Sequence, residues 1–238
     1  MGILERTGTL PDDLADASLA LARAFGAGAT MWCLAPGLEA HARHLAVEFV
    51  HPVIMGKRAL PAVAVAGADA LALLRVQTKP GDVLVAVAGA DEPTVGAAMR
   101  RCRAWGIASL WIGAGPRPAP GAADVVLWSD DPRAPYSGGA VLLYHLLWEL
   151  THVCFEHAGL LRDHPDAPAA PVSCADEPCI TCSDEGRLAE ILSVEDDRRA
   201  QVRTPAGVEA VDLSLVDDAR PGDLVIVHAG SALSVVER

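Results

Sequence analysis

The hydrophobic periodicity of this chain changes across a proline-rich segment, and that change limits what the chain can fold into. Before residue 162, apolar residues recur at helical spacing or in short continuous runs such as Val83-Leu84-Val85-Ala86-Val87. After residue 178, apolar and polar residues alternate in short stretches such as 189–194. The sequence therefore predicts a mixed α/β region followed by an all-β region.

Helices and strands are expected to alternate in the first region, which we place at residues 1–161. Predicted helices span 14–25, 40–50, 69–74, 93–105 and 137–157, and predicted strands span 30–35, 62–66, 83–87, 109–112 and 124–127. Strands separated by helices predict a parallel sheet covered on both faces, which makes a three-layer sandwich.

The segment 162–178 is rich in proline and alanine, has no periodicity and is interpreted as a linker. The second domain is placed at 179–238. Its short predicted strands span 189–194, 200–203, 208–212 and 224–227 and are separated by turns. This pattern predicts a small barrel of about five strands.

Composition excludes several classes of function. The net charge of −12 over 238 residues leaves no basic stripe to neutralise nucleic-acid phosphates. No apolar run is long enough to cross a bilayer, and residues 1–6 lack the pattern of a signal peptide. We therefore expect a cytoplasmic protein with neither a nucleic-acid nor a membrane partner.

The six cysteines fall into two groups. Cys33, Cys102 and Cys154 lie in apolar stretches and are predicted to be small buried hydrophobes. Cys174, Cys179 and Cys182 cluster within nine residues, which in a reducing compartment indicates metal or thiol chemistry. A closed zinc site would need further ligands, for which Cys174 and His164 are candidates. A thioredoxin-type motif would open a helix, whereas a strand follows here.

Histidines and carboxylates share a helix face at two places. His44 and Glu48 stand at i and i+4 of a predicted helix. His145, Glu149 and His152 stand at i, i+4 and i+7 of the long predicted helix. Such nitrogen and oxygen donors suit zinc or another divalent ion. The alternative is a polar interface between helices or between the subunits of a dimer.

The C-terminal quarter resembles the HypC/HupF family of hydrogenase maturation chaperones. The resemblance rests on Cys179-Ile180-Thr181, on 186–191, on 211–216 and on the ending at 222–230. It implies a small OB-like barrel, a cysteine that holds iron while cyanide and carbon monoxide are attached, and two partners, a HypD-like maturation protein and the hydrogenase large subunit.

Cys179 is the candidate for that iron-holding cysteine, since an exposed thiolate is a soft metal ligand. The family cysteine usually follows the initiator methionine, whereas Cys179 is internal and Cys182 is an additional thiol. His228 is either a residue at the end of a surface strand or part of a partner-docking surface.

Residues 10–160 resemble the SIS (sugar isomerase) family, in particular its metal-dependent sedoheptulose-phosphate isomerase branch. The matching features are the helix with His44 and Glu48, the strand at 81–87 that leads into a phosphate loop, and His152 on the late helix. The resemblance implies a three-layer sandwich that binds phosphosugars and forms a homodimer or a larger oligomer.

Two loops depart from that family. Its phosphate loops carry hydroxyl side chains. The corresponding loops here read Ala35-Pro36-Gly37-Leu38-Glu39 and Ala88-Gly89-Ala90-Asp91-Glu92-Pro93, with no hydroxyls and with added acids. We therefore expect a hydrogenase maturation chaperone with an SIS-like scaffold or sensor domain rather than an enzyme. The alternatives are a metal-dependent phosphosugar isomerase that uses His44, Glu48 and His152, and a regulatory sugar-phosphate sensor.

Overall fold

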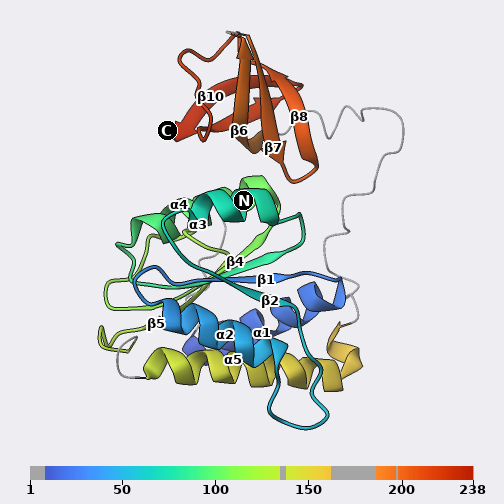
Figure 1. The fold of residues 1–238 in the computed structure, drawn as a ribbon, viewed down its shortest axis with the longest axis vertical. Helices are drawn as coiled ribbons and strands as arrows, with labels where there is room; N and C mark the ends of the chain where they lie inside the picture. The colour runs from blue at the N-terminus through green and yellow to red at the C-terminus, as the bar shows by residue number, and fades with distance from the viewer. Residues whose placement is uncertain (1–8, 135–137, 162–185, 197, 238) are drawn as a thin grey trace. The chain divides into compact units, whose positions relative to one another are not determined.

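The computed structural model describes residues 9–134, 138–161, 186–196 and 198–237, which form two compact units. The first is an α/β unit and the second is a β-barrel (Figure 1). The fold class predicted from the change of periodicity is therefore confirmed. The predicted linker at 162–178 lies outside the described residues.

A parallel sheet of five strands forms the centre of the α/β unit, in the order β2-β1-β3-β4-β5. The strands are β1 (Met31–Leu34), β2 (Ala62–Val65), β3 (Val83–Val87), β4 (Ala108–Ala114) and β5 (Val125–Ser129). β1 and β3 are buried along their whole length because helices cover both faces of the sheet, which explains their continuous apolar sequences. The edge strand β2 is partly exposed.

Helices lie on both faces of this sheet (Figure 1). One face carries α1 (Leu10–Gly26), α2 (Glu39–Val50) and α5 (Gly139–Glu156), and the other carries α3 (Ala70–Gln77) and α4 (Pro93–Trp105). A 3-10 turn, η1 (Ala158–Leu161), follows α5. α1 begins four residues earlier than predicted because Thr9 and Asp12 form a capping box. Among the described residues, no helix combines the length and the apolar character that crossing a lipid bilayer requires.

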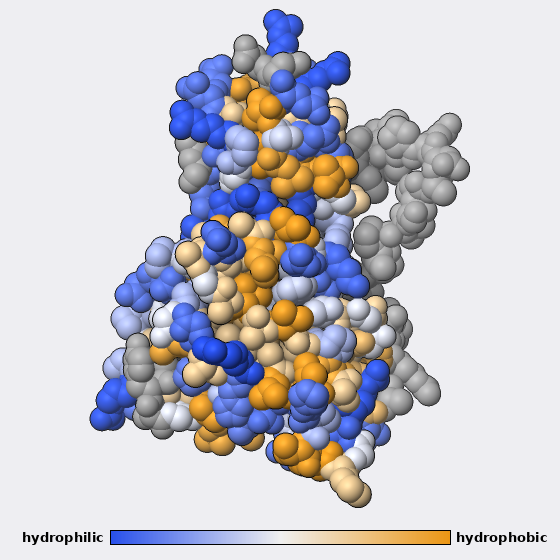
Figure 2. Space-filling model, in the orientation of Figure 1, coloured by the Kyte–Doolittle hydropathy of each residue, from blue (hydrophilic) through white to orange (hydrophobic). Residues whose placement is uncertain are grey.

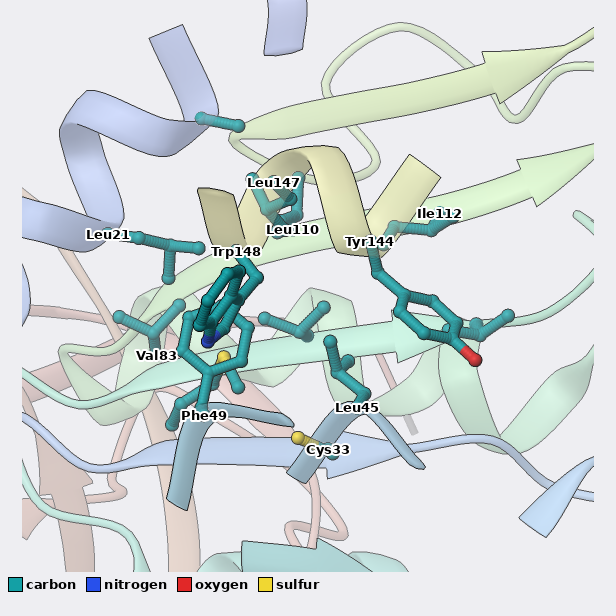
Figure 3. Packing of buried hydrophobic residues seen from close by; sticks show 14 of the residues in the cluster. Leu21, Cys33, Leu45, Phe49, Val83, Leu110, Ile112, Tyr144, Leu147 and Trp148 are labelled. Carbon is teal, nitrogen blue, oxygen red and sulfur yellow. The ribbon is translucent and has the colours of Figure 1, made fainter. Parts of the chain in front are cut away.

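The main core lies between the sheet and the helices α1, α2 and α5 (Figure 3). Phe49 of α2 stacks on Phe25 of α1 with ring centroids 5.7 Å apart. Cys33, Cys102 and Cys154 are buried, as predicted. Burial raises the pKa of the Cys33 thiol far above its usual range, so this cysteine behaves as a small hydrophobe.

The barrel is closed by strands in the order β10-β8-β7-β6-β9. They are β6 (Arg187–Asp196), β7 (Arg199–Thr204), β8 (Gly207–Asp212), β9 (Leu224–His228) and β10 (Ser231–Glu237). Alternate residues such as Ala189 with Ile191, and Val225 with Val227, belong to the hydrophobic core inside the barrel. β8 and β10 pair in parallel, and the other neighbours pair antiparallel.

The strand β10 was not predicted, because the alternation of apolar and polar residues is broken along it. Its pairing with β9 shifts register between Ala232 and Ser234 and again between Val235 and Glu237. Each shift disrupts the period of two. The turn before it is regular, since Ala229 and Gly230 both have positive φ (47° and 78°), as a two-residue hairpin requires.

A buried carboxylate joins the neighbouring strands β1 and β3 at their amino ends. Asp82, 1% exposed, accepts the backbone N–H groups of Thr30 (2.9 Å) and Lys79 (3.0 Å) and the indole N–H of Trp32 (2.9 Å). It therefore fixes β1 against the turn that leads into β3. Asp124 joins β4 to β5 similarly through Ser109, but it is exposed to solvent.

Replacing Asp82 should destabilise the α/β unit. Asp82→Asn puts an amide donor among three donors, and Asp82→Ala leaves all three without this acceptor. We expect losses of about 1–3 kcal/mol for Asn and more for Ala in the free energy of unfolding. Tryptophan fluorescence during urea denaturation follows this loss, because four of the five tryptophans belong to the first compact unit.

Asp124→Asn is the matched control, since it removes the same kind of acceptor from an exposed position where water replaces it. We expect a change below about 0.5 kcal/mol for this variant. Equal losses for the Asp82 and Asp124 variants would contradict the role given to burial.

Candidate metal centre

A cluster of metal-ligand side chains lies where α2 meets α5. His44 and Glu48 stand one turn apart on α2, and His145 projects toward them from α5. Buried neighbours determine the positions of His44 and His145, because Leu45 and Tyr144 both belong to the core beneath (Figure 3). Burying these two neighbours holds His44 and His145 at the margin between the two helices.

The three donor atoms form a nearly regular triangle. Nε2 of His44 lies 3.1 Å from Oε1 of Glu48 and 3.2 Å from Nε2 of His145, and the third side, from His145 Nε2 to Glu48 Oε1, is 3.5 Å. In a tetrahedral zinc site with bonds of about 2.0–2.1 Å, neighbouring ligand atoms lie about 3.3–3.4 Å apart. The residues present therefore fit a tetrahedral ion that keeps one position for water or a small ligand.

The cluster is accessible to solvent. The side chains of His44 and His145 are 38% and 44% exposed, and that of Glu48 is 19% exposed. An ion could enter without local unfolding. Three protein ligands with an open fourth position are the arrangement of catalytic rather than structural zinc. An ion bound in this way would supply Lewis-acid chemistry.

Two further side chains contact the cluster from below, and neither was among the residues predicted from the sequence. The Tyr144 hydroxyl oxygen lies 2.9 Å from Nδ1 of His44 and 3.4 Å from Nδ1 of His41. Burial, together with the charge of Glu48, raises the pKa of Tyr144 to about 12, so the residue stays a neutral phenol. The i, i+3, i+7 spacing of His41, His44 and Glu48 is the sequence signal that could have indicated His41. No such signal exists for Tyr144, whose sequence context is that of a core residue.

The structure does not bring His152 and Glu149 into this cluster. Both ring nitrogens of His152 face backbone carbonyl oxygens, Nδ1 that of Trp148 at 2.9 Å and Nε2 that of Arg58 at 3.1 Å. Glu149 is exposed. His145 and His152 share a helix face, as predicted, but seven residues separate them by about 10 Å along the helix axis.

His152 instead belongs to a set of contacts that fix the segment after α2. Lys57 forms an ion pair with Glu156, which lowers the pKa of that carboxyl. The Arg58 guanidinium lies over the Phe155 ring, 4.9 Å from its centroid. Together with the His152 contact to Arg58, these interactions hold the segment against α5.

Carboxylates of the chain itself accept N–H groups in the two loops that the SIS resemblance aligns with phosphate loops. After β1, the Gly37 N–H donates to Oε1 of Glu39 (3.1 Å). After β3, the N–H of Thr94 in the first turn of α4 donates to Oε1 of Glu92 (3.2 Å). An α-helix N-terminus attracts anions, and here an internal carboxylate already accepts one of its N–H groups.

The remaining predicted site residues belong to the barrel unit. Cys179 and Cys182 lie outside the described residues. His228 ends β9, is partly buried, and pairs through its backbone with Ser231 across the hairpin. Its side chain is therefore at the rim of the barrel.

Comparison with known proteins identifies the two units separately. The model of the HupF/HypC family matches residues 188–238, which include most of the barrel. Comparison with curated protein sequences gives no significant match.

The α/β unit is similar to solved structures of phosphoheptose isomerases. The enzyme from Francisella tularensis superposes with a TM-score of 0.55 at 17% identity, over 63% of this chain and 90% of that chain. The enzyme GmhA from Neisseria gonorrhoeae superposes with a TM-score of 0.50 at 18% identity, over 60% of this chain and 86% of that chain. At this identity the likeness shows the fold alone. The chain is therefore a fusion of an α/β unit that has the SIS fold of phosphoheptose isomerases with a C-terminal domain that matches the HupF/HypC family.

Proposed function

We propose that this chain is a hydrogenase maturation chaperone whose barrel handles the iron centre and whose α/β unit is a metal-binding scaffold. The observation that carries the proposal is the match of the closed barrel to the HupF/HypC family. Iron is cargo in this function, passed on during assembly of the hydrogenase active site.

Cys179 is the residue proposed to hold that iron. A thiolate is a soft ligand that iron accepts, and a position before the barrel would let one sulfur share the metal with a partner. The proposed partners are a HypD-like maturation protein and the hydrogenase large subunit. His228 lies at the barrel rim, where its imidazole could form part of the docking surface.

The α/β unit is proposed to bind a divalent ion, with zinc the best fit, through His44, Glu48 and His145. The donor-atom spacing supports this choice, because it already matches tetrahedral coordination. We propose that this unit also forms the homodimer, as a scaffold that presents the barrels.

An isomerase that acts on phosphosugars is the competing function, and an ion with an open position would favour it. The loops argue against it. A phosphate charge about 4 Å from Glu92 would be repelled by about 4 kcal/mol at an effective dielectric constant of about 20. The N–H groups of Gly37 and Thr94 that would offset this repulsion already have carboxylate partners.

Loss of Cys179 should abolish chaperone function without unfolding the protein. In cells that lack the endogenous copy, Cys179→Ala should leave hydrogenase activity at background, because no soft ligand remains for iron. Cys182→Ala is the matched control and should retain most of the activity. Purified variants with equal thermal unfolding midpoints exclude a folding defect. An equal loss in both variants would indicate instead that the two thiols act as one ligand set.

The full-length protein should bind zinc at the α2–α5 cluster. We expect one equivalent of Zn²⁺ per chain from this site in isothermal titration, with Cys179→Ala/Cys182→Ala as the background so that these thiols do not contribute. In that background His44→Ala should weaken binding at least about 10-fold, while His152→Asn should leave the affinity nearly unchanged. A loss with His152→Asn that matches the loss with His44→Ala would contradict the assigned ligands.

Sugar phosphates should not bind. Titration of the full-length protein with C5–C7 sugar phosphates should give no measurable heat of binding and no isomerase turnover, whereas a phosphoheptose isomerase measured in parallel gives both. Micromolar affinity for any of these compounds would contradict the chaperone-scaffold assignment and favour the isomerase or the sugar-phosphate sensor.

A further inference from the structure

We propose that Tyr144 is a positioning residue for the metal: its hydroxyl orients His44 and holds this ligand in the tautomer that can bind the ion. The inference rests on the metal site of the proposed function and goes one step further, to a residue that touches the ligand rather than the metal. It concerns the contact between the Tyr144 hydroxyl and Nδ1 of His44 at 2.9 Å.

The need for such a residue follows from imidazole chemistry. A histidine that binds a metal through Nε2 is neutral and carries its one ring proton on Nδ1. Nε2 of His44 is the atom that faces both Glu48 and His145. Its Nδ1 must therefore be the donor, and the Tyr144 oxygen lies at hydrogen-bond distance to accept that proton.

Glu48 makes the choice of tautomer a real competition. Its Oε1 lies 3.1 Å from Nε2 of His44, so this carboxylate favours a proton on Nε2, the tautomer that cannot bind an ion there. The Tyr144 oxygen favours the opposite tautomer by accepting from Nδ1. Removing this acceptor shifts His44 toward the tautomer that cannot bind the metal.

A hydroxyl suits this position because it can accept and donate at the same time. When its oxygen accepts from His44, its hydrogen can point toward Nδ1 of His41, 3.4 Å away. His44, Tyr144 and His41 then form a directed chain of hydrogen bonds that begins at the metal ligand, with each residue donating to the next. Neighbours of this kind raise the basicity of a metal-bound histidine.

The fixed location of the hydroxyl makes it an effective positioning group. The Tyr144 side chain is fully buried, and in Figure 3 its ring lies in the core with its oxygen directed away from Phe49 and Trp148. Its ring packs edge-on to both His44 (79° between planes) and its sequence neighbour His145 (73°). Tyr144 thus contacts the ligand from each helix.

The experiment compares Tyr144→Phe with the parent protein in the background without Cys179 and Cys182, by titration with Zn²⁺ alone. The substitution removes one oxygen and keeps the ring. We expect zinc affinity to fall about 10- to 100-fold, the range found when such supporting contacts are lost. Thr151→Val is the matched control. It removes another buried hydroxyl of α5, one that bonds to the Leu147 carbonyl oxygen away from the cluster, and should leave the zinc affinity unchanged.

The tautomer itself gives a second readout. In zinc-loaded parent protein, a long-range ¹H–¹⁵N spectrum should show a proton on Nδ1 of His44 that exchanges slowly with water, since it is bonded to a buried oxygen. The same proton should exchange rapidly in Tyr144→Phe. If that variant fails to fold, a rapidly exchanging Nδ1 proton in the parent protein overturns the inference by itself.

The outcomes separate the two proposals. If the parent protein and His44→Ala bind zinc equally, or neither binds it, the metal site is wrong and the inference falls with it. If the parent binds zinc at His44 and Tyr144→Phe binds it equally well, the site stands and the role of Tyr144 is refuted. Weaker binding in Tyr144→Phe, with unchanged binding in Thr151→Val, supports the inference.

Discussion

The packing of α2 against α5 on one face of the sheet decides where the α/β unit can carry out chemistry. Leu45 and Tyr144 are buried in the shared core, so the residues beside them, His44 and His145, are forced to the margin between the helices. The hydrophobic effect thus supplies most of the precision of the candidate metal centre. The donor atoms need only small side-chain adjustments to reach coordination distances.

The sequence predicted the order of helices and strands and the ligand types, but not how the two helices align. Helical spacing placed His44 and Glu48 together, because both lie on one element. Choosing between His145 and His152 depends on how far α5 is displaced along α2, which local patterns do not contain. The missed strand β10 has a different cause: the register shifts in its pairing with β9 erase the local period of two.

Two different metal chemistries are combined in one chain under this proposal. The α/β unit offers two imidazoles and a carboxylate, a set that suits zinc, whereas the segment before the barrel offers thiolates, which suit softer ions and iron. Zinc also binds thiolates, so ligand type alone does not keep the two ions apart. Under this proposal the sites differ in the fate of the ion: the imidazole and carboxylate set holds a resident ion, whereas Cys179 passes its iron on as cargo.

The internal carboxylates at the two loops bear on how this unit would respond to phosphorylated metabolites in a cell. Glu39 and Glu92 each accept one backbone N–H group at these loops, so each loop already holds a negative charge where an anion would otherwise be attracted. Phosphorylated metabolites are abundant in cells and fluctuate with nutrition. If the unit is the proposed scaffold, its availability for assembly would then not depend on the concentration of these metabolites.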